Sequence, residues 1–483
     1  LLYSFYQFQG REQKMKKVLI KNGTIVTATD EFKGDLLLAD GKIAAIGGAI
    51  DASSADEVYD AEGKYVMPGG VDQHTHFDFS FGDTTCVGWE GSPAAVVSGT
   101  TTIIDFVNQK VGSSLKASID EYQKNKVDGN ACCDYGYHGV VYDANDALFE
   151  EIEHMPEYGV TSLKLFMAYR GQPYHCDDDA VLKALQASKK SGVTIMVHAE
   201  SADMIATLQK QVAASGVTGP IGHALSRPPV VEEEAVSRAA YLAELAAAPI
   251  YVVHVTAKGA MEVIRDRYEK GVAIFGETCT HYLTITTDAL EKPGFEGAKA
   301  VCSPALRSQD HLDAMWEAVK KGWLNAISSD HCGFNYETHK HAGYGEGKTF
   351  ADIPNGAPGL ENRIPVVWTE GVEKGKISRK KFVELIATNP AKINGLFPQK
   401  GTLAVGSDAD VVIWDPTYKG TISIENSLQG CDYCAFEGFD QIGRADKVFL
   451  RGELVADAGK YVGEKGSGKF VPGKPYGLCY ELA

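Results

Sequence analysis

Positive charge is in short supply in this 483-residue sequence: 47 lysines and arginines stand against 64 aspartates and glutamates, for a formal net charge of −17. Nucleic acids and anionic membrane surfaces are themselves negative, so we expect the chain to bind neither. Its apolar runs are also too short for a membrane-spanning helix, which needs about 20 residues. We therefore expect its partner to be a small, neutral or weakly charged molecule.

Cysteine is sparse as well. Ten cysteines in a chain of this length are too dilute for a disulfide framework, and several fall within predicted strands. The start also lacks the charged and apolar regions of a signal peptide, so we expect a cytoplasmic protein with reduced thiols. Residues 1–14 precede the first methionine, Met15, and are left out of the fold prediction.

The two ends of the chain share one sequence pattern. Short β-rich runs alternate with Asn-Gly, Lys-Gly and Asp-Gly turns, a pattern typical of antiparallel hairpins. Neither end is long enough for a core of its own. We therefore predict that residues 15–65 and 399–465 combine into one small β-sandwich domain, followed by a terminal arm at 466–483.

Between these ends, residues 66–398 alternate short apolar β runs with longer helical stretches. Eight strands separated mostly by helices predict an α/β fold of the TIM type, a parallel (β/α)8 barrel. A doubly wound sheet would alternate in the same way, but no Gly-rich phosphate-binding turn follows the first strand. The predicted strands are 64–74, 100–107, 134–141, 161–168, 193–200, 249–256, 272–279 and 325–332.

Unusual polar residues stand in or at the ends of five of these strands. His74 and His76 are two residues apart, so in an extended chain their side chains point the same way. In a (β/α)8 barrel the carboxyl ends of the strands form the catalytic mouth, and four imidazoles with a carboxylate are ligands that zinc accepts. The set that we expect there is His74, His76, Lys164, His198, His254 and Asp330.

Lys164 is the unexpected member of this set, because an ammonium repels metal cations and burial favours the neutral amine. A neutral amine that adds carbon dioxide becomes a carbamate, whose two oxygens can join two metal ions about 3.5–4 Å apart. The alternative is that Lys164 extends to the surface or pairs with a carboxylate.

Taken together, the motifs resemble the dihydropyrimidinase and D-hydantoinase branch of the cyclic amidohydrolases, from about Lys16 to Gly473. The motifs that carry the resemblance are GGVDQHTHFDFSFG (69–82), SLKLFMAYRG (162–171), MVHAES (196–201), VVHVTA (252–257), ETCTHYL (277–283), SPALRS (303–308), SSDHCGFN (328–335) and IPNGAPGLENR (353–363).

The resemblance implies a homotetramer, in which the terminal arm would dock on a neighbouring subunit; the alternative is that this arm is a loose end. It implies hydrolysis of dihydrouracil, dihydrothymine and 5-substituted hydantoins to N-carbamoyl amino acids by a zinc-bridging hydroxide. It also implies two zinc ions per subunit: the more buried ion on His74, His76 and Asp330, the second on His198 and His254, and N6-carboxylated Lys164 as the bridge.

Further roles also come from the resemblance. The Tyr169 hydroxyl would support the oxyanion, and Asp330 would carry a proton from the attacking hydroxide to the departing ring nitrogen. Backbone groups of Ser303 and Asn355 would hold the cyclic imide. Considered without the resemblance, Tyr169 could be a rim aromatic, and the other two could be turn residues.

Three other functions compete with this one. Dihydroorotase would carry an arginine two positions after the histidine pair, where this sequence has Asp78. An allantoinase-like cyclic ureide hydrolase stays open. A non-catalytic dihydropyrimidinase-related interaction protein would lack some of the six site residues, and none is missing here.

Three further polar residues near the motifs are not expected to bind metal. His331 follows Asp330 directly and should point away from the mouth, since neighbouring strand residues face opposite ways. His281 and Asp72 are expected to support the ligands from behind.

Overall fold

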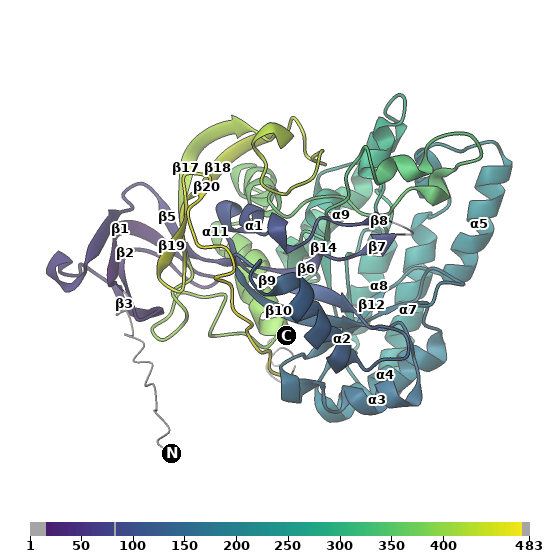
Figure 1. Cartoon of the computed structure of the whole chain (residues 1–483), viewed down its shortest axis with the longest axis horizontal. Coiled ribbons are helices and arrows are strands. Elements are labelled where there is room, and N and C mark those ends of the chain that lie inside the picture. Colours follow the sequence, from purple (N-terminus) through teal and green to yellow (C-terminus); the bar gives the residue numbers. More distant parts are fainter. Residues whose placement is uncertain (1–15, 82–83, 476–483) are drawn as a thin grey trace, which may run out of the picture.

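The computed structural model describes residues 16–81 and 84–475. Figure 1 shows a helix-covered barrel beside a curved sheet whose purple and yellow strands come from opposite ends of the chain. No helix in the described part of the chain combines the length and the apolar character that crossing a membrane requires.

The barrel is a parallel sheet in which each strand pairs with the next along the chain. Only Ser329 and Asp330 separate β15 from β16, and these two strands pair with opposite ends of the sheet, so one interrupted strand closes the barrel. The predicted (β/α)8 barrel is confirmed, with its eighth strand broken at Asp330. The strands are β6 (Gly70–His76), β9 (Thr100–Asn108), β10 (Asp134–Val140), β11 (Ser162–Phe166), β12 (Thr194–His198), β13 (Ile250–Val252), β14 (Ile274–Cys279), β15 (Ala326–Ser328) and β16 (His331–Cys332).

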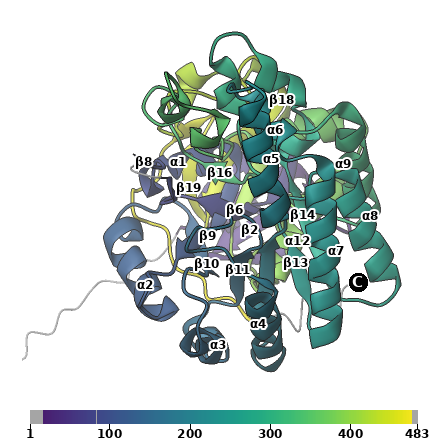
Figure 2. The ribbon, with the colours of Figure 1, turned by 90° about the vertical axis from the view of Figure 1, so that its right-hand side faces the viewer.

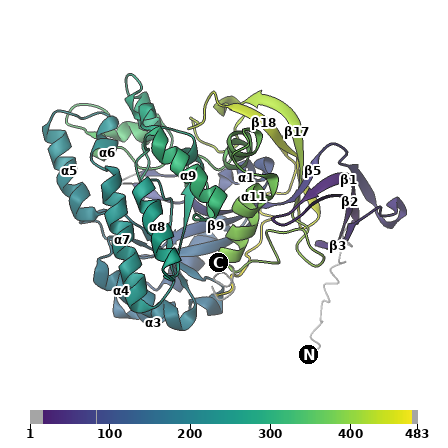
Figure 3. The same cartoon turned by 180° about the vertical axis from the view of Figure 1, so that it is seen from behind.

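Helices surround the outer face of the barrel (Figures 2 and 3). The helix α4 (Asp178–Ser191) illustrates how the sequence sets their limits. Asp177 caps its start by accepting from the Ala180 N–H at 3.0 Å, and Gly192 ends it at φ 76°. The other α-helices are α1 (Pro93–Ser98), α2 (Leu115–Tyr122), α3 (Asp146–Ile152), α5 (Ala202–Ala214), α6 (Ile221–Leu225), α7 (Pro229–Ala246), α8 (Lys258–Glu269), α9 (Gln309–Lys321), α10 (Arg363–Val367), α11 (Arg379–Val383) and α12 (Asn389–Ile393).

Both ends of the chain contribute to the terminal sheet, as the sequence predicted. The strands β5 and β17 pair antiparallel and join the two halves, and one apolar core that includes Ile20, Leu36, Ile413 and Phe449 is shared between them. The strands are β1 (Val18–Val26), β2 (Glu31–Ala39), β3 (Lys42–Gly47), β4 (Glu57–Asp60), β5 (Tyr65–Pro68), β17 (Val411–Thr421), β18 (Asp440–Leu450), β19 (Glu453–Asp457) and β20 (Lys460–Tyr461).

The chain passes from the terminal sheet to the barrel at Gly69. The sequence predicted one strand over 64–74, whereas the structure has β5 in the terminal sheet and β6 in the barrel. A Cβ at Gly69 would lie 2.0 Å from Thr101 Oγ1, so this close crossing of two strands requires glycine. The crossing sets the start of β6, which carries the histidine pair.

The described part of the terminal arm packs against its own barrel. The Tyr135 N–H donates to the Lys469 carbonyl at 2.9 Å, and the Val471 N–H donates to the Tyr135 carbonyl at 2.7 Å. The rest of the predicted arm, 476–483, lies outside the described residues.

Candidate metal centre

Residues from three strand positions meet at the carboxyl end of the barrel. His74 Nε2 lies 3.1 Å from Asp330 Oδ1, and His76 Nε2 lies 3.4 Å from the same oxygen. The amine of Lys164, on β11, lies 3.0 Å from His74 Nε2. All four residues are buried, so two imidazoles, a carboxylate and an amine share a site that is nearly closed to water.

The other two predicted ligands join this cluster. The rings of His198, at the end of β12, and His254, just after β13, have centroids 4.5 Å apart, and His254 lies 5.3 Å from the His74 ring. Ligand atoms of His74, His254 and Asp330 all lie within 4.8 Å of one another. His254 Nδ1 is buried and has no hydrogen-bond partner among the described residues, as expected of a nitrogen whose partner is a metal ion.

Two buried glutamates orient the histidines, and the sequence analysis missed both. Glu277 Oε1 lies 2.5 Å from His74 Nδ1, and Glu200 Oε2 lies 2.7 Å from His198 Nε2 and 2.5 Å from the Arg227 guanidinium. Each contact occupies one ring nitrogen and leaves the other for a metal ion. A clue was present in the sequence, since Glu277 interrupts an apolar barrel strand and Glu200 follows His198 by two residues.

Burial lowers the pKa of several members of the cluster, whereas that of His74 is raised because the carboxylates of Asp330 and Glu277 outweigh its burial. Burial lowers the pKa of His76 to about 3, that of His254 well below its usual value, and that of Lys164 to about 8. For Asp330 burial acts in the opposite direction, but the charge and hydrogen bonds of His74 and the hydrogen bond from His76 outweigh it and hold the pKa well below its usual range. His76 and His254 are thus held neutral and Asp330 ionised, which are the states that metal binding requires, and a metal ion would have to displace the proton that His74 favours.

Three of the eight non-glycine residues with positive φ in the described part of the chain lie at this site. Tyr169, His254 and Asp330 have φ of 63°, 40° and 49°, in the left-handed region that L residues with side chains rarely adopt. Such strain persists where the surrounding structure imposes it, and functional sites are where it gathers. It turns the chain sharply at the ends of the strands that supply these side chains.

A cavity of about 30 Å³ opens over the cluster. Tyr169, Ser303 and Asn355 line it, together with Lys164 and His254, so the predicted substrate residues and the predicted ligands share one space. The Tyr169 ring is held against His198, 5.3 Å between centroids, and under the Arg227 guanidinium at 5.3 Å.

The three residues that were expected to stay off the metal occupy different positions. Asp72 accepts from the Ser329 N–H at 3.1 Å, which steadies the strand break before Asp330. His331 turns away from the mouth and accepts from the Gly359 N–H at 3.2 Å.

His281 lies nearer to the cluster than expected. Its ligand atom, together with those of Cys279 and Asp330, forms a group whose members are all within 4.8 Å of one another. Cys332, which the sequence analysis did not select, forms a similar group with His76 and Asp330.

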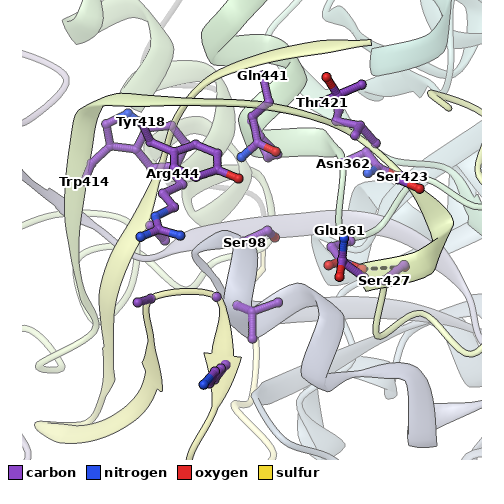
Figure 4. Close-up of a pocket in the computed structure, with 18 residues that line it drawn as sticks. Ser98, Glu361, Asn362, Trp414, Tyr418, Thr421, Ser423, Ser427, Gln441 and Arg444 are labelled. Atoms are coloured by element: carbon purple, nitrogen blue, oxygen red, sulfur yellow. Dashed lines mark hydrogen bonds between the residues drawn. The ribbon is translucent and has the colours of Figure 1, made fainter. Parts of the chain in front are cut away.

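A larger pocket, about 500 Å³, lies between the β17–β18 hairpin and the barrel (Figure 4). Arg444 stacks on Tyr418 there at 4.4 Å, and Glu361 accepts from the Ser427 hydroxyl at 2.6 Å. None of the metal-ligand groups found among the described residues draws on this pocket. The arrangement suited to catalysis is therefore the one in the barrel mouth.

Comparison with known proteins identifies the family. The chain is 46% identical to the D-hydantoinase of Geobacillus stearothermophilus over 95% of its own length and 97% of the relative's, and 37% identical to a D-phenylhydantoinase of Escherichia coli strain SE11 over 95% and 99%. The solved dihydropyrimidinase of Brevibacillus agri superposes with a TM-score of 0.92 at 45% identity, covering 95% of this chain and 99% of that one. Residues 65–455 match the amidohydrolase family, and the chain belongs to it.

Proposed function

We propose that this protein opens the ring of cyclic amides, with 5,6-dihydropyrimidines such as dihydrouracil and dihydrothymine, and 5-substituted hydantoins, as substrates and N-carbamoyl amino acids as products. Its family membership and its D-hydantoinase relatives make it a metal-dependent hydrolase that acts on cyclic amides. The observation that carries the proposal is the convergence of six donor residues beneath one cavity.

The residues fit two zinc ions. His74, His76 and Asp330 would hold one ion and His198 and His254 the other, with carboxylated Lys164 between them. The unpartnered His254 Nδ1 and the absence of any carboxylate ion pair to Lys164 among the described residues support this assignment. When bound, the ions would supply activated water at neutral pH and polarise the ring carbonyl.

The remaining steps belong to side chains and backbone. Tyr169 would donate its hydroxyl to the oxygen on which negative charge develops, a contact that is strongest in the transition state. Asp330, held ionised in the cluster, would accept a proton and return it to the departing ring nitrogen. Ser303 and Asn355 would orient the imide edge of the ring through their backbone groups.

The competing substrates are less well matched. Asp78, at the position where dihydroorotase would need an arginine, lies 3.1 Å from the Lys126 amine and offers no cation to a substrate carboxylate. The six site residues are all present and clustered, which does not favour a purely non-catalytic role.

We further propose that the protein is cytoplasmic and that it assembles as a homotetramer. One face of α7 carries exposed apolar side chains, with Val230 55%, Tyr241 56% and Leu245 72% accessible, which is the kind of surface that subunit contacts cover. Light scattering coupled to size-exclusion chromatography would give the mass, and a monomer at micromolar concentration would contradict the assembly.

The deciding experiment strips the protein with a chelator, reloads it with zinc and bicarbonate, and follows ring opening of dihydrouracil beside a 5-monosubstituted hydantoin. Restoration of activity by zinc is the expected result, and the ratio of the two rates ranks the substrates. Absence of ring opening on both, with metal demonstrably bound, would refute the proposed substrates and bring allantoin to the front.

A further inference from the structure

Lys340 is a fully buried lysine outside the candidate metal centre. Its amine donates to the carbonyls of Val301 at 2.8 Å, Pro354 at 2.6 Å and Gly356 at 2.5 Å. Among the described residues it forms no ion pair with a carboxylate. A buried ammonium is costly unless its hydrogen bonds are satisfied, so the role of Lys340 is to bind these three carbonyls.

The three carbonyls lie beside the two residues that are proposed to hold the substrate. Pro354 and Gly356 flank Asn355 on either side, and Val301 precedes Ser303 by two residues. Because the carbonyls of Pro354 and Gly356 both accept from one amine, the backbone on either side of Asn355 is fixed. Asn355 is one of the residues that line the cavity.

Two other contacts hold the segments around Ser303 and Asn355 in place. The Gly356 N–H donates to the Val301 carbonyl at 3.0 Å, which joins the two segments directly. His223 Nε2 lies 2.8 Å from the Cys302 carbonyl, so the carbonyls of both residues before Ser303 are already engaged.

The backbone groups of Ser303 and Asn355 have no hydrogen-bond partner among the described residues. Neither residue's N–H or C=O makes a hydrogen bond to any described residue, although both residues line the cavity over the metal cluster. Backbone groups in protein interiors are nearly always paired, so two neighbouring residues with free groups in one cavity indicate a ligand that pairs with them.

We propose that Lys340 is a positioning residue for the substrate. Its amine fixes the segments 301–303 and 354–356 so that the free backbone groups of Ser303 and Asn355 face the imide edge of a cyclic amide. This inference rests on the proposed function, because the ligand it describes is the substrate of that reaction. Lys340 itself touches neither the metal ligands nor the reacting atoms.

The test compares Lys340→Met, which keeps the length of the side chain but removes its donors, with Lys340→Gln, which keeps two donors. Lys348→Met is the matched control, an exposed lysine eight residues away. Bound metal, thermal unfolding, kcat and KM are measured for dihydrouracil and for a hydantoin. Metal content should be unchanged in all three variants.

We expect KM to rise about tenfold or more in Lys340→Met, which corresponds to about 1.4 kcal/mol, and to rise less in Lys340→Gln. KM should rise by the same factor for both substrates, because both present the same imide edge. The control should keep the wild-type KM. Should Lys340→Met fail to fold, Lys340→Gln decides by the same criterion.

The inference is overturned if a folded, metal-loaded variant keeps the wild-type KM, or if kcat falls together with the metal content while KM does not move. These outcomes differ from failure of the proposed function, in which the wild-type protein itself would open neither ring.

Discussion

Glu277 offers a direct test of how the metal centre is built. Its Oε1 lies 2.5 Å from His74 Nδ1, while its Oε2 accepts from the Gln73 amide at 2.7 Å and from the Ser328 hydroxyl. The change Glu277→Gln is nearly isosteric but replaces one acceptor oxygen with an NH2 group. In either orientation the new NH2 group therefore faces another donor, which is His74 on one side or Gln73 and Ser328 on the other.

The expected cost follows from that mismatch. If the amide keeps its oxygen toward His74, the Gln73 and Ser328 donors lose their acceptor in a buried site, at about 1–3 kcal/mol each. If it turns round, His74 loses the partner that orients its ring. Loss of such a supporting contact typically lowers metal affinity about 10–100-fold, or about 1.4–2.8 kcal/mol.

The assay is zinc retention after dialysis against graded chelator concentrations, with activity measured as zinc is added back. We expect the variant to lose zinc at a lower chelator concentration and to regain activity at high zinc. Asp35→Asn is a suitable control, a buried carboxylate of the terminal sheet that accepts from two backbone N–H groups at 2.9 Å. Wild-type zinc retention in a folded Glu277→Gln protein would refute the reasoning.

Three further changes test other parts of the structure. Tyr169→Phe should lower kcat about 10²–10³-fold with KM and bound metal unchanged, and an unchanged kcat in steady-state assays would exclude the oxyanion role. Lys164→Met should reduce bound metal below two ions per chain and abolish ring opening, whereas an active variant with two ions, measured by elemental analysis, would contradict the bridge. Lys400→Met should destabilise the fold by about 3–5 kcal/mol in urea unfolding, because three buried aspartates lose a shared cation and, among the described residues, only Asp134 and Asp408 keep another, Arg451 and Lys42; a loss below about 1 kcal/mol would contradict this.

The barrel and the convergence of polar residues at its mouth were predictable because both depend on local patterns. Alternating β runs and helices indicate the fold, and residues at strand ends indicate the mouth. His74 and His198 could be selected in this way, since each stands at the end of an apolar run. Their roles in catalysis remain predictions, whereas their convergence is seen in the structure.

The supporting contacts were not predictable, because they join distant parts of the sequence. Glu277 and His74 are 203 residues apart, and their contact exists only once the barrel closes. The backbone turn at Asp330 is equally hidden, since nothing in the letters SSDHC signals a positive φ at an aspartate. A sequence pattern fixes which side of a strand a residue faces, and barrel closure then decides what it meets across the interior.

Three buried lysines show how partners rather than burial decide the role of a side chain. Lys400 has three carboxylates, which outweigh the effect of burial and raise its pKa. Its charge is therefore permanent, and its function is to hold the barrel to the terminal sheet. Lys340 has three carbonyls, and burial lowers its pKa to about 8. All the directions in which its amine donates are occupied by backbone.

Lys164 has neither kind of partner. Its amine lies 4.2 Å from the Phe106 ring centroid, 5.0 Å from the Phe166 centroid and 3.0 Å from His74 Nε2. Aromatic faces satisfy a cation weakly, and burial lowers its pKa to about 8, so about a tenth of the amine is neutral at pH 7. Of the three lysines, this one combines an amine that is partly neutral with a position on the cavity and beside the proposed metal ligands. We propose that the neutral amine adds carbon dioxide and releases a proton, so that a carbamate anion would replace the buried cation and could bridge two metal ions.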